Sequence, residues 1–361
     1  MDTRPVGGDR SITAAATAEA KAFPAGGRLR HRWSRRLALA AVVAAGGATA
    51  AILAPRRFMV EGTSMAPGLL PGDVVATDPL PLGDRLREPG RFDRWVLAAD
   101  DGPPVIKRIA GLPGETVSLV AGDLVVVGRT ILKGPRLLAE MGSKVAADGS
   151  PAAAGGADSS GWLWSLPGGE VLDDEPQMTA TSVLLLPVRD VGCAAVVQVP
   201  RQPGASPLRV RARVADTVFT WRLRKAGRYA VVAGRLDGHL VAAAWRLPRE
   251  IAARPVPRSC LPPAAPEAWT AVRPWGDSAA ADTAPAVAVG LEPAAAVALA
   301  GATMEHAWRW RDVHHRAAAD GTASWQCPPD TVFVLGDCPA ASRDSRHWGP
   351  LPRSVLRQRI H

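Results

Sequence analysis

Ser64 and Lys107 are the residues of this chain whose types and setting could support nucleophilic chemistry. A serine hydroxyl is a weak nucleophile unless a base takes its proton, and a lysine can be that base if its amine is neutral. Burial lowers the pKa of a lysine because desolvation penalises the ammonium form. Lys107 lies among the apolar residues 105–106 and 109–110. A lysine within a strand ordinarily faces solvent, and the strand pattern alone favours that orientation here. It is the co-occurrence of Lys107 with the motifs described next that favours a buried lysine serving as the base.

Three runs of the sequence carry Gly, Pro and polar residues at fixed spacing: residues 60–73, 105–115 and 336–349. The first contains Ser64 and the second contains Lys107. The third is a polar run rich in Asp, Ser and Arg near the C-terminus. A serine, one candidate lysine base and an ordered polar loop together predict a hydrolase.

These runs resemble segments of the bacterial type I signal peptidases, which are Ser/Lys endopeptidases. Residues 62–67 match the family pattern G-x-S-M-x-P, and the Gly-Asp pair at 72–73 follows it as in the family. Residues 107–114 match K-R-[VI]-x-G-x-P-G. Residues 336–349 match most of G-D-N-x-x-x-S-x-D-S-R-x-x-G. The matches occur in the family's order and cover about 55–135 and 306–361.

The resemblance implies a role for each matched residue. Ser64 would attack the scissile carbonyl, and neutral Lys107 would take its proton and pass it to the leaving amine. Ser342 would hydrogen bond the lysine amine and aim it. The Ser64 backbone N–H would supply one oxyanion donor. The remaining matched charges would form ion pairs that hold the loops: Arg108 with Asp337, and Asp344 with Arg346.

The chain departs from the family pattern at several positions. Gly62 stands where some members carry a serine that donates to the oxyanion, so any second donor must come from elsewhere. Gly68 replaces the usual threonine, and Cys338-Pro339 replaces the usual Asn-Arg. His347 lies near Asp344, which leaves a Ser/His arrangement conceivable, but the family tends to have an aromatic ring there. We therefore expect a packing role for His347.

The N-terminal region predicts a membrane anchor. Residues 37–54 are eighteen residues without a charge, which is near the lower limit for crossing a bilayer. A cleaved secretory signal is the alternative, but the apolar run is longer than usual for one and Pro55-Arg56-Arg57 follows it. Arginines crowd before the run, which predicts a cytoplasmic N-terminus and a catalytic domain on the outer side of the cytoplasmic membrane.

The charge pattern argues against nucleic-acid binding. Residues 1–36 carry +5 of the formal net charge of +9, so the rest of the chain is only mildly basic. No basic patch with interleaved aromatic residues accompanies that charge. No spacing of Cys or His residues fits zinc, and we expect neither a metal nor a cofactor. Disulfides are compatible with an outer location, and three pairings of Cys193, Cys260, Cys327 and Cys338 stay open.

Alternating residues predict a mainly β fold built from antiparallel sheets. Arg209, Arg211 and Arg213 alternate with apolar residues, which is typical of a half-buried strand. Asp237-Gly238 predicts a hairpin turn, and residues 250–300 read as loop. We expect a signal-peptidase-like catalytic domain with a large β-rich insertion. The segments are a disordered basic tail (1–36), an anchor helix (37–54), a first catalytic segment (55–135), an accessory insertion with flexible linkers (136–305) and a second catalytic segment (306–361).

The function implied by the resemblance is removal of signal peptides from exported preproteins after small-x-small sites. Residues 61–64 could pair with an extended substrate by strand addition, and Met65 and Leu69-Leu70 are candidates for the cleft floor or for plain core. The expected partners are signal peptides and the membrane, with the secretion machinery as a further candidate. The alternatives are a peptidase that is specialised for one or a few secreted proteins, and an inactive membrane-tethered β-domain binding protein.

Overall fold

The computed structural model describes residues 56–77, 88–98, 102–145, 162–168, 170–171, 186–200, 208–249, 259–275, 284–292, 302–318 and 320–360. These residues belong to one compact unit, Pro55–His361. The predicted basic tail and anchor, residues 1–54, lie outside the described residues. Within the described residues, no helix has the length and apolar character needed to cross a bilayer.

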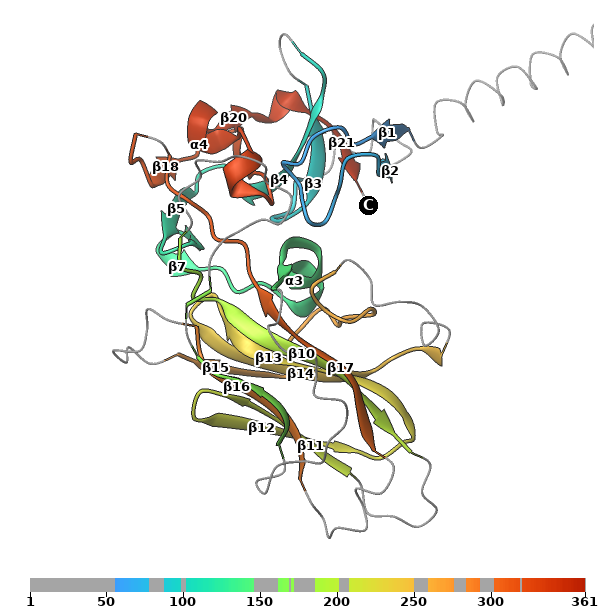
Figure 1. The fold of residues 1–361 in the computed structure, drawn as a ribbon. Helices are drawn as coiled ribbons and strands as arrows, with labels where there is room; N and C mark the ends of the chain where they lie inside the picture. Colours follow the sequence, from blue (N-terminus) through green and yellow to red (C-terminus); the bar gives the residue numbers. More distant parts are fainter. Residues whose placement is uncertain are drawn as a thin grey trace, which may run out of the picture. The chain divides into compact units, whose positions relative to one another are not determined.

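The described region is mainly β, as the alternation predicts, and every paired strand is antiparallel (Figure 1). A five-stranded sheet carries the lysine motif. Its strands, in spatial order, are β20 (Leu351–Pro352), β19 (Thr331–Leu335), β4 (Val105–Gly111), β3 (Arg94–Leu97) and β21 (Leu356–Ile360). Strands from both ends of the sequence therefore pair directly, because β4 lies between β19 and β3.

Two smaller sheets accompany it. The first is the ribbon of β1 (Arg57–Met59) and β2 (Val74–Ala76), whose connecting turn holds the serine motif. The second is a four-stranded sheet, and the first of its strands along the sequence begins just after the lysine motif. Its strands are β18 (Ser324–Gln326), β5 (Thr116–Val120), β6 (Asp123–Val126) and β7 (Arg129–Thr130).

The middle of the chain forms two further sheets. The larger one has six strands: β15 (Ala271–Pro274), β14 (His239–Arg246), β13 (Gly227–Leu236), β10 (Val191–Val199), β17 (Thr303–Arg311) and β8 (Ser143–Val145). The smaller one has four strands: β12 (Thr217–Leu223), β11 (Leu208–Val214), β16 (Val287–Glu292) and β9 (Trp162–Leu166). Inward residues of both sheets share one apolar core, so the two sheets pack face to face.

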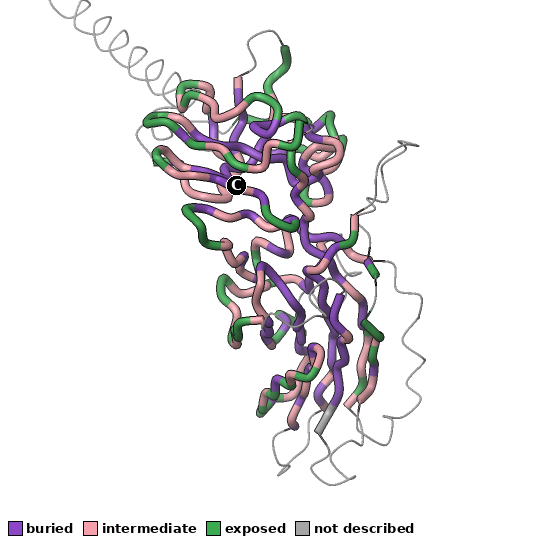
Figure 2. The backbone as a smooth tube through the Cα atoms, turned by 90° about the vertical axis from the view of Figure 1, so that its left-hand side faces the viewer, coloured by how far each residue is buried: buried purple, intermediate pink, exposed green. Residues whose placement is uncertain are grey.

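The six-stranded sheet is covered on its other face as well. Residues of β10 and β13 are buried almost without interruption, which is the pattern of a strand with both faces covered (Figure 2). The covering element is α3 (Pro135–Met141), together with residues 260–261 (Figure 1). Gly134 precedes α3 and Pro135 opens it, where a missing N–H costs nothing.

The fold tests several of the strands, turns and loops expected from the sequence. The alternating strand at 209–213 is confirmed as β11, with its arginines half-buried and its apolar residues buried. Asp237-Gly238 is confirmed as the turn between β13 and β14, with φ of 48° and 73°. The expectation of loop throughout 250–300 is wrong, because β15 and β16 lie there and pair within both middle sheets. Strand β17 crosses the predicted segment boundary at residue 305, and the division into catalytic and accessory segments stays a prediction.

The four cysteines are buried and free. They come from separate places in the fold: β10, the segment beside α3, the residue after β18 and the loop after β19. None of the three disulfide pairings left open by the sequence is formed.

Candidate active site

The turn that carries Ser64 is fixed by buried apolar neighbours on its C-terminal side. Met65 and Leu69 are buried in one core cluster with Val60 and Val75, so these two candidates for a substrate floor serve as core, whereas Leu70 is only partly buried. The Leu69 N–H donates to the Met65 carbonyl at 2.9 Å, which makes the turn compact. Ser64 itself is only partly buried, at the edge of this core.

Lys107 lies in the middle of β4 and is 3% exposed. Its Nζ donates to the Ser342 Oγ at 3.0 Å. Burial lowers the pKa of Lys107 from 10.5 to about 8, and the carboxylates of Asp344 and Asp337 oppose that fall without cancelling it. With that pKa the amine is neutral in about one molecule in ten at pH 7 and in about half at pH 8, and a general base requires the neutral form.

The loop after β19 supplies Ser342 and is held by Asp344. That carboxylate caps α4 (Ser345–Trp348) by accepting from the Arg346 N–H at 3.2 Å, and it also accepts from the Gly336 N–H at 3.0 Å. The Arg346 guanidinium donates to the same carboxylate at 2.8 and 2.9 Å. Burial alone would raise the pKa of Asp344, but the hydrogen bonds from Arg346 and Gly336 and the nearby Ser342 hydroxyl lower it below 3.8.

The same loop contacts the Ser64 turn through the main chain. The Cys338 N–H donates to the Ser64 carbonyl oxygen at 3.0 Å. A Cβ on Gly336 would lie 2.5 Å from that carbonyl oxygen and would collide with the Ser342 hydroxyl, so this approach needs glycine. The loop therefore connects the turn that carries Ser64 to the serine that holds Lys107.

The loop after β19 thus contacts both the Ser64 main chain and the Lys107 amine, and no hydrogen bond joins the Ser64 hydroxyl to that amine among the described residues. Catalytic hydrogen bonds in structures without substrate are often long and tighten only in the substrate complex. A missing hydrogen bond between Ser64 and Lys107 is therefore no argument against their pairing as nucleophile and base.

Arg108 and Asp337 form the second predicted ion pair. The guanidinium donates to the carboxylate twice, at 2.8 and 2.7 Å, and both side chains are buried. Arg108 also donates to the Phe92 carbonyl at 2.8 Å. A buried bidentate pair of this kind fixes the orientation of two segments, here β4 and the end of β19.

His347 differs from the expectation of a packing role. Its ring is exposed, and its Nδ1 accepts from the Asp344 N–H at 3.4 Å, which closes the capping box of α4. His347 therefore acts on the loop that carries Ser342 rather than on an apolar core.

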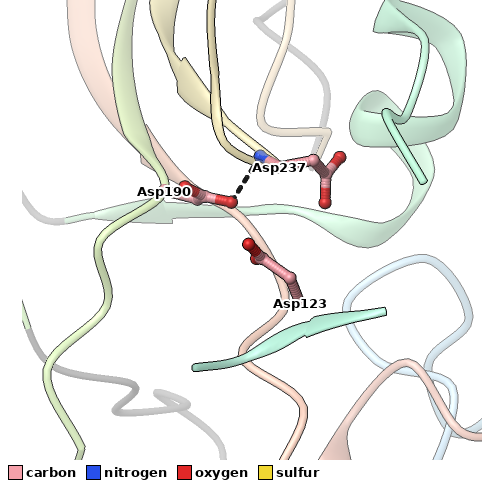
Figure 3. Close-up of side chains that lie close together, drawn as sticks. All are labelled: Asp123, Asp190 and Asp237. Carbon is pink, nitrogen blue, oxygen red and sulfur yellow. Dashed lines mark hydrogen bonds between the residues drawn. The ribbon is translucent and has the colours of Figure 1, made fainter. Parts of the chain in front are cut away.

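The described residues contain one group of three potential metal ligands, and it lies apart from Ser64 and Lys107 in the fold. The carboxylate oxygens of Asp123, Asp190 and Asp237 lie within 4.8 Å of one another (Figure 3). The Asp237 N–H donates to Asp190 at 2.6 Å, and the ammonium of Lys133 pairs with Asp237 and with Asp312, the latter at 2.9 Å. Because protein donors already contact two of these three carboxylates, those of Asp190 and Asp237, the group is explained as a charge cluster.

Two features of this arrangement were missed by the sequence interpretation. The charge cluster joins residues that are far apart in the sequence, so no local pattern signals it. Helix α3 and its Glu140, which contacts Arg108 at 3.4 Å, had a signal that was not used: Gly134-Pro135 is a typical helix start.

A family model described as "Signal peptidase, peptidase S26" matches residues 30–171 and 293–360. The match covers more than half of the chain, and the unmatched stretch, 172–292, falls within the predicted insertion. No curated protein gives a significant match. The family is one of serine peptidases whose substrates are preproteins that carry signal peptides. The chain belongs to this signal peptidase family, peptidase S26.

Proposed function

We propose that the chain is a membrane-anchored endopeptidase that removes signal peptides with Ser64 as nucleophile and neutral Lys107 as general base. The observation that carries the proposal is the setting of Lys107. Its amine is buried, its pKa is lowered to about 8, and it donates to Ser342 in the loop that also bonds the Ser64 main chain.

The first step of the reaction is a proton transfer that accompanies attack by the serine. Lys107 Nζ takes the Ser64 hydroxyl proton as Oγ attacks the scissile carbonyl carbon, and the same proton then goes to the amine that leaves when the C–N bond breaks. The product is an ester on Ser64. Water next gives a proton to Lys107 while its oxygen attacks the ester, and the Ser64 oxygen regains a proton as the C–O bond breaks.

The developing oxyanion needs donors. Among the described residues the Ser64 N–H makes no hydrogen bond, so it is available to the substrate carbonyl. Ser342 would hold the lysine amine in the direction of Ser64. Arg108 with Asp337, and Asp344 with Arg346, would keep the two supporting segments in place.

Location and substrate belong to the same proposal. Residues 37–54 would anchor the protein once in the cytoplasmic membrane, with the tail inside and the catalytic domain outside, and the arginines before the anchor support this orientation. Preproteins would then present their small-x-small sites beside the catalytic domain, and the secretion machinery could deliver them. Digestion of intact and lysed cells with an added protease tests the orientation: the catalytic domain should be cut in both.

The activity is tested with a labelled preprotein that ends its signal peptide in Ala-x-Ala. Wild type should cleave it, and Ser64→Ala and Lys107→Ala should lose at least about a thousandfold in kcat/KM. Ser118→Ala and Lys225→Ala alter a half-buried serine of β5 and an exposed lysine, and should behave as wild type. Below pH 8 the wild-type rate should fall about tenfold per pH unit, because Lys107 gains its proton there.

Other outcomes separate the competing functions. Near-normal activity of Lys107→Ala would mean that another group is the base. Cleavage of a single natural partner, with no cleavage of general preproteins, would support a specialised processing peptidase. Absence of turnover by the folded wild type would support a binding protein.

A further inference from the structure

Helix α3 contacts the turn that carries Ser64. A Cβ at Gly68 would collide with the main-chain oxygen of Glu140, which is near the C-terminal end of α3. Gly68 has no left-handed backbone conformation that would itself demand glycine, so the helix is what excludes a side chain there. This contact explains why position 68 holds a glycine and not a residue with a side chain.

The side chain of Glu140 contacts the strand that carries the proposed base. Its carboxylate lies 3.4 Å from the Arg108 Nη1 and 4.0 Å from the Arg94 Nε. Arg108 follows Lys107 directly and is 4% exposed, so movement of its guanidinium would move the buried segment beside the lysine. Glu140 therefore contacts the nucleophile turn with its main chain and strand β4 with its side chain.

The position of α3 is determined by the middle of the chain. Two carbonyls near the C-terminal end of the helix accept hydrogen bonds from the side chains of residues 259–260. The Ser259 hydroxyl donates to Ala139 at 2.8 Å, and the Cys260 thiol donates to Leu138 at 3.1 Å. Leu138 is fully buried against the six-stranded sheet. The sheet thus fixes one side of the helix, while Glu140 on the helix contacts Gly68 and Arg108.

We infer that Glu140 is a positioning residue, which sets the separation of Ser64 and Lys107 by contacting Gly68 and Arg108 at the same time. The inference rests on the proposed function and adds that the middle sheets take part in catalysis through α3. Small errors in the alignment of reacting groups cost large factors in rate, so a modest contact can matter for turnover.

The competing explanation is an ordinary surface ion pair. Glu140 is 32% exposed on its side chain, and exposed pairs contribute about 0–1 kcal/mol to stability. That explanation predicts no effect on turnover. The positioning role predicts lower turnover with little change in stability, so the two differ in a measurable quantity.

The test compares Glu140→Ala, Glu140→Gln and Gly68→Ala with a control on the same helix. Arg136→Ala removes the exposed pair with Glu267 at the other end of α3 and touches neither Gly68 nor Arg108. Each full-length protein is assayed on the preprotein for kcat and KM, and kcat is expressed per active serine counted with a serine-reactive inhibitor. Thermal unfolding is measured in parallel.

Glu140→Ala should lower kcat per active site about tenfold with KM unchanged. Glu140→Gln should recover most of the loss, because its amide oxygen can accept from Arg108. Gly68→Ala should lower kcat by at least as much, and Arg136→Ala should match wild type. The pH at which activity rises should stay near 8 in all of them, because the charges that act on Lys107 are those of Asp344, Asp337 and Arg346.

The inference is overturned if Glu140→Ala has the wild-type kcat per active site, or if its loss appears only as fewer folded molecules. It is also overturned if Arg136→Ala lowers kcat per active site by the same factor as Glu140→Ala. Those results leave the proposed function intact so long as Ser64→Ala and Lys107→Ala are inactive. Activity that survives in Ser64→Ala would instead remove the proposed function itself.

Discussion

The described residues include two buried lysines, and the net direction of the pKa shift is opposite in the two. Lys107 is 3% exposed and Lys133 is 1% exposed. Lys107 donates to a neutral hydroxyl, and burial lowers its pKa to about 8. Burial acts on Lys133 in the same direction, but its ion pairs with Asp237 and Asp312 raise its pKa above the ordinary 10.5. Burial is therefore not sufficient to make a lysine a base, because the partners determine the direction.

The acids around the two lysines explain the difference. Near Lys107, the two carboxylates are already paired with arginines: Asp337 with Arg108, and Asp344 with Arg346. Near Lys133, the carboxylates of Asp123, Asp190 and Asp237 lie close together (Figure 3), and the lysine pairs directly with Asp237 and Asp312. The arginines of the proposed active site thus have an electrostatic role beyond holding loops, since they leave Lys107 without a direct anionic partner.

The largest effect should follow from removing the charge of Lys133. Lys133→Met should lower the free energy of unfolding by about 3–5 kcal/mol, because it leaves buried carboxylates without their cation. Urea unfolding measures the loss. The loss should be smaller at pH 5 than at pH 8, because burial already raises the pKa of Asp237 to about 7 and protonation removes the uncompensated charge.

A double variant controls for simple loss of packing. Lys133→Met combined with Asp237→Asn should regain some of the stability, and Asn tolerates the left-handed turn conformation at this position. If the double variant is as unstable as the sum of the two single changes, the lysine contributes through its shape and the comparison of the two lysines fails.

A second change should give Lys107 a direct carboxylate partner, as Lys133 has. Ser342→Asp places a carboxylate where the lysine amine now meets a hydroxyl, 3.0 Å away. The pH at which activity rises should move upward by about two units, which is about a hundredfold loss at pH 7. Activity recorded from pH 6 to 10 on the preprotein measures the shift.

Ser342→Asn is the matched control, since it has the size of Asp and no charge. It should lower the maximal rate, while its activity still rises near pH 8. Equal shifts in both variants would mean that the hydroxyl geometry, and not the absence of a negative charge, determines the pKa of Lys107.

The two lysines also show what the sequence can predict. Lys107, Ser64 and Ser342 lie in runs with distinctive spacing, and alternation located strands such as β11 correctly. Lys133 lies in no such run. Its partners are 104 and 179 residues further along the chain, so no local spacing signals them. Only the pairing of distant strands brings these acids together.

Helix α3 was missed for a different reason. It has seven residues, too few to establish a 3.6-residue period, and its start signal is the dipeptide Gly134-Pro135. The role of Gly68 was equally inaccessible, since a glycine that excludes a collision with a distant carbonyl looks like any other glycine in a turn. The contact at Gly68 depends on packing between distant segments, which composition and spacing do not encode.

The smallest expected effect concerns Asp123, whose pKa is raised from 3.8 to about 6 by burial and by the charge of Asp237. Since the folded protein keeps this proton while the unfolded chain loses it near pH 4, the group stabilises the fold fully below pH 4. That contribution is lost as pH rises through 6. Asp123→Asn cannot lose a proton, and its amide can donate to the neighbouring Asp190.

We therefore expect Asp123→Asn to raise the free energy of unfolding by about 1 kcal/mol at pH 8 and to leave it unchanged at pH 4. Asp216→Asn changes an exposed turn residue and should have no effect at either pH. Urea titrations at the two pH values measure the difference. A variant that is destabilised equally at both would mean that Asp123 acts as an ionised partner of Lys133. The carboxylates near each of the two lysines would then be balanced by cations. Lys107 and Lys133 would differ only in the hydrogen bonds that they make.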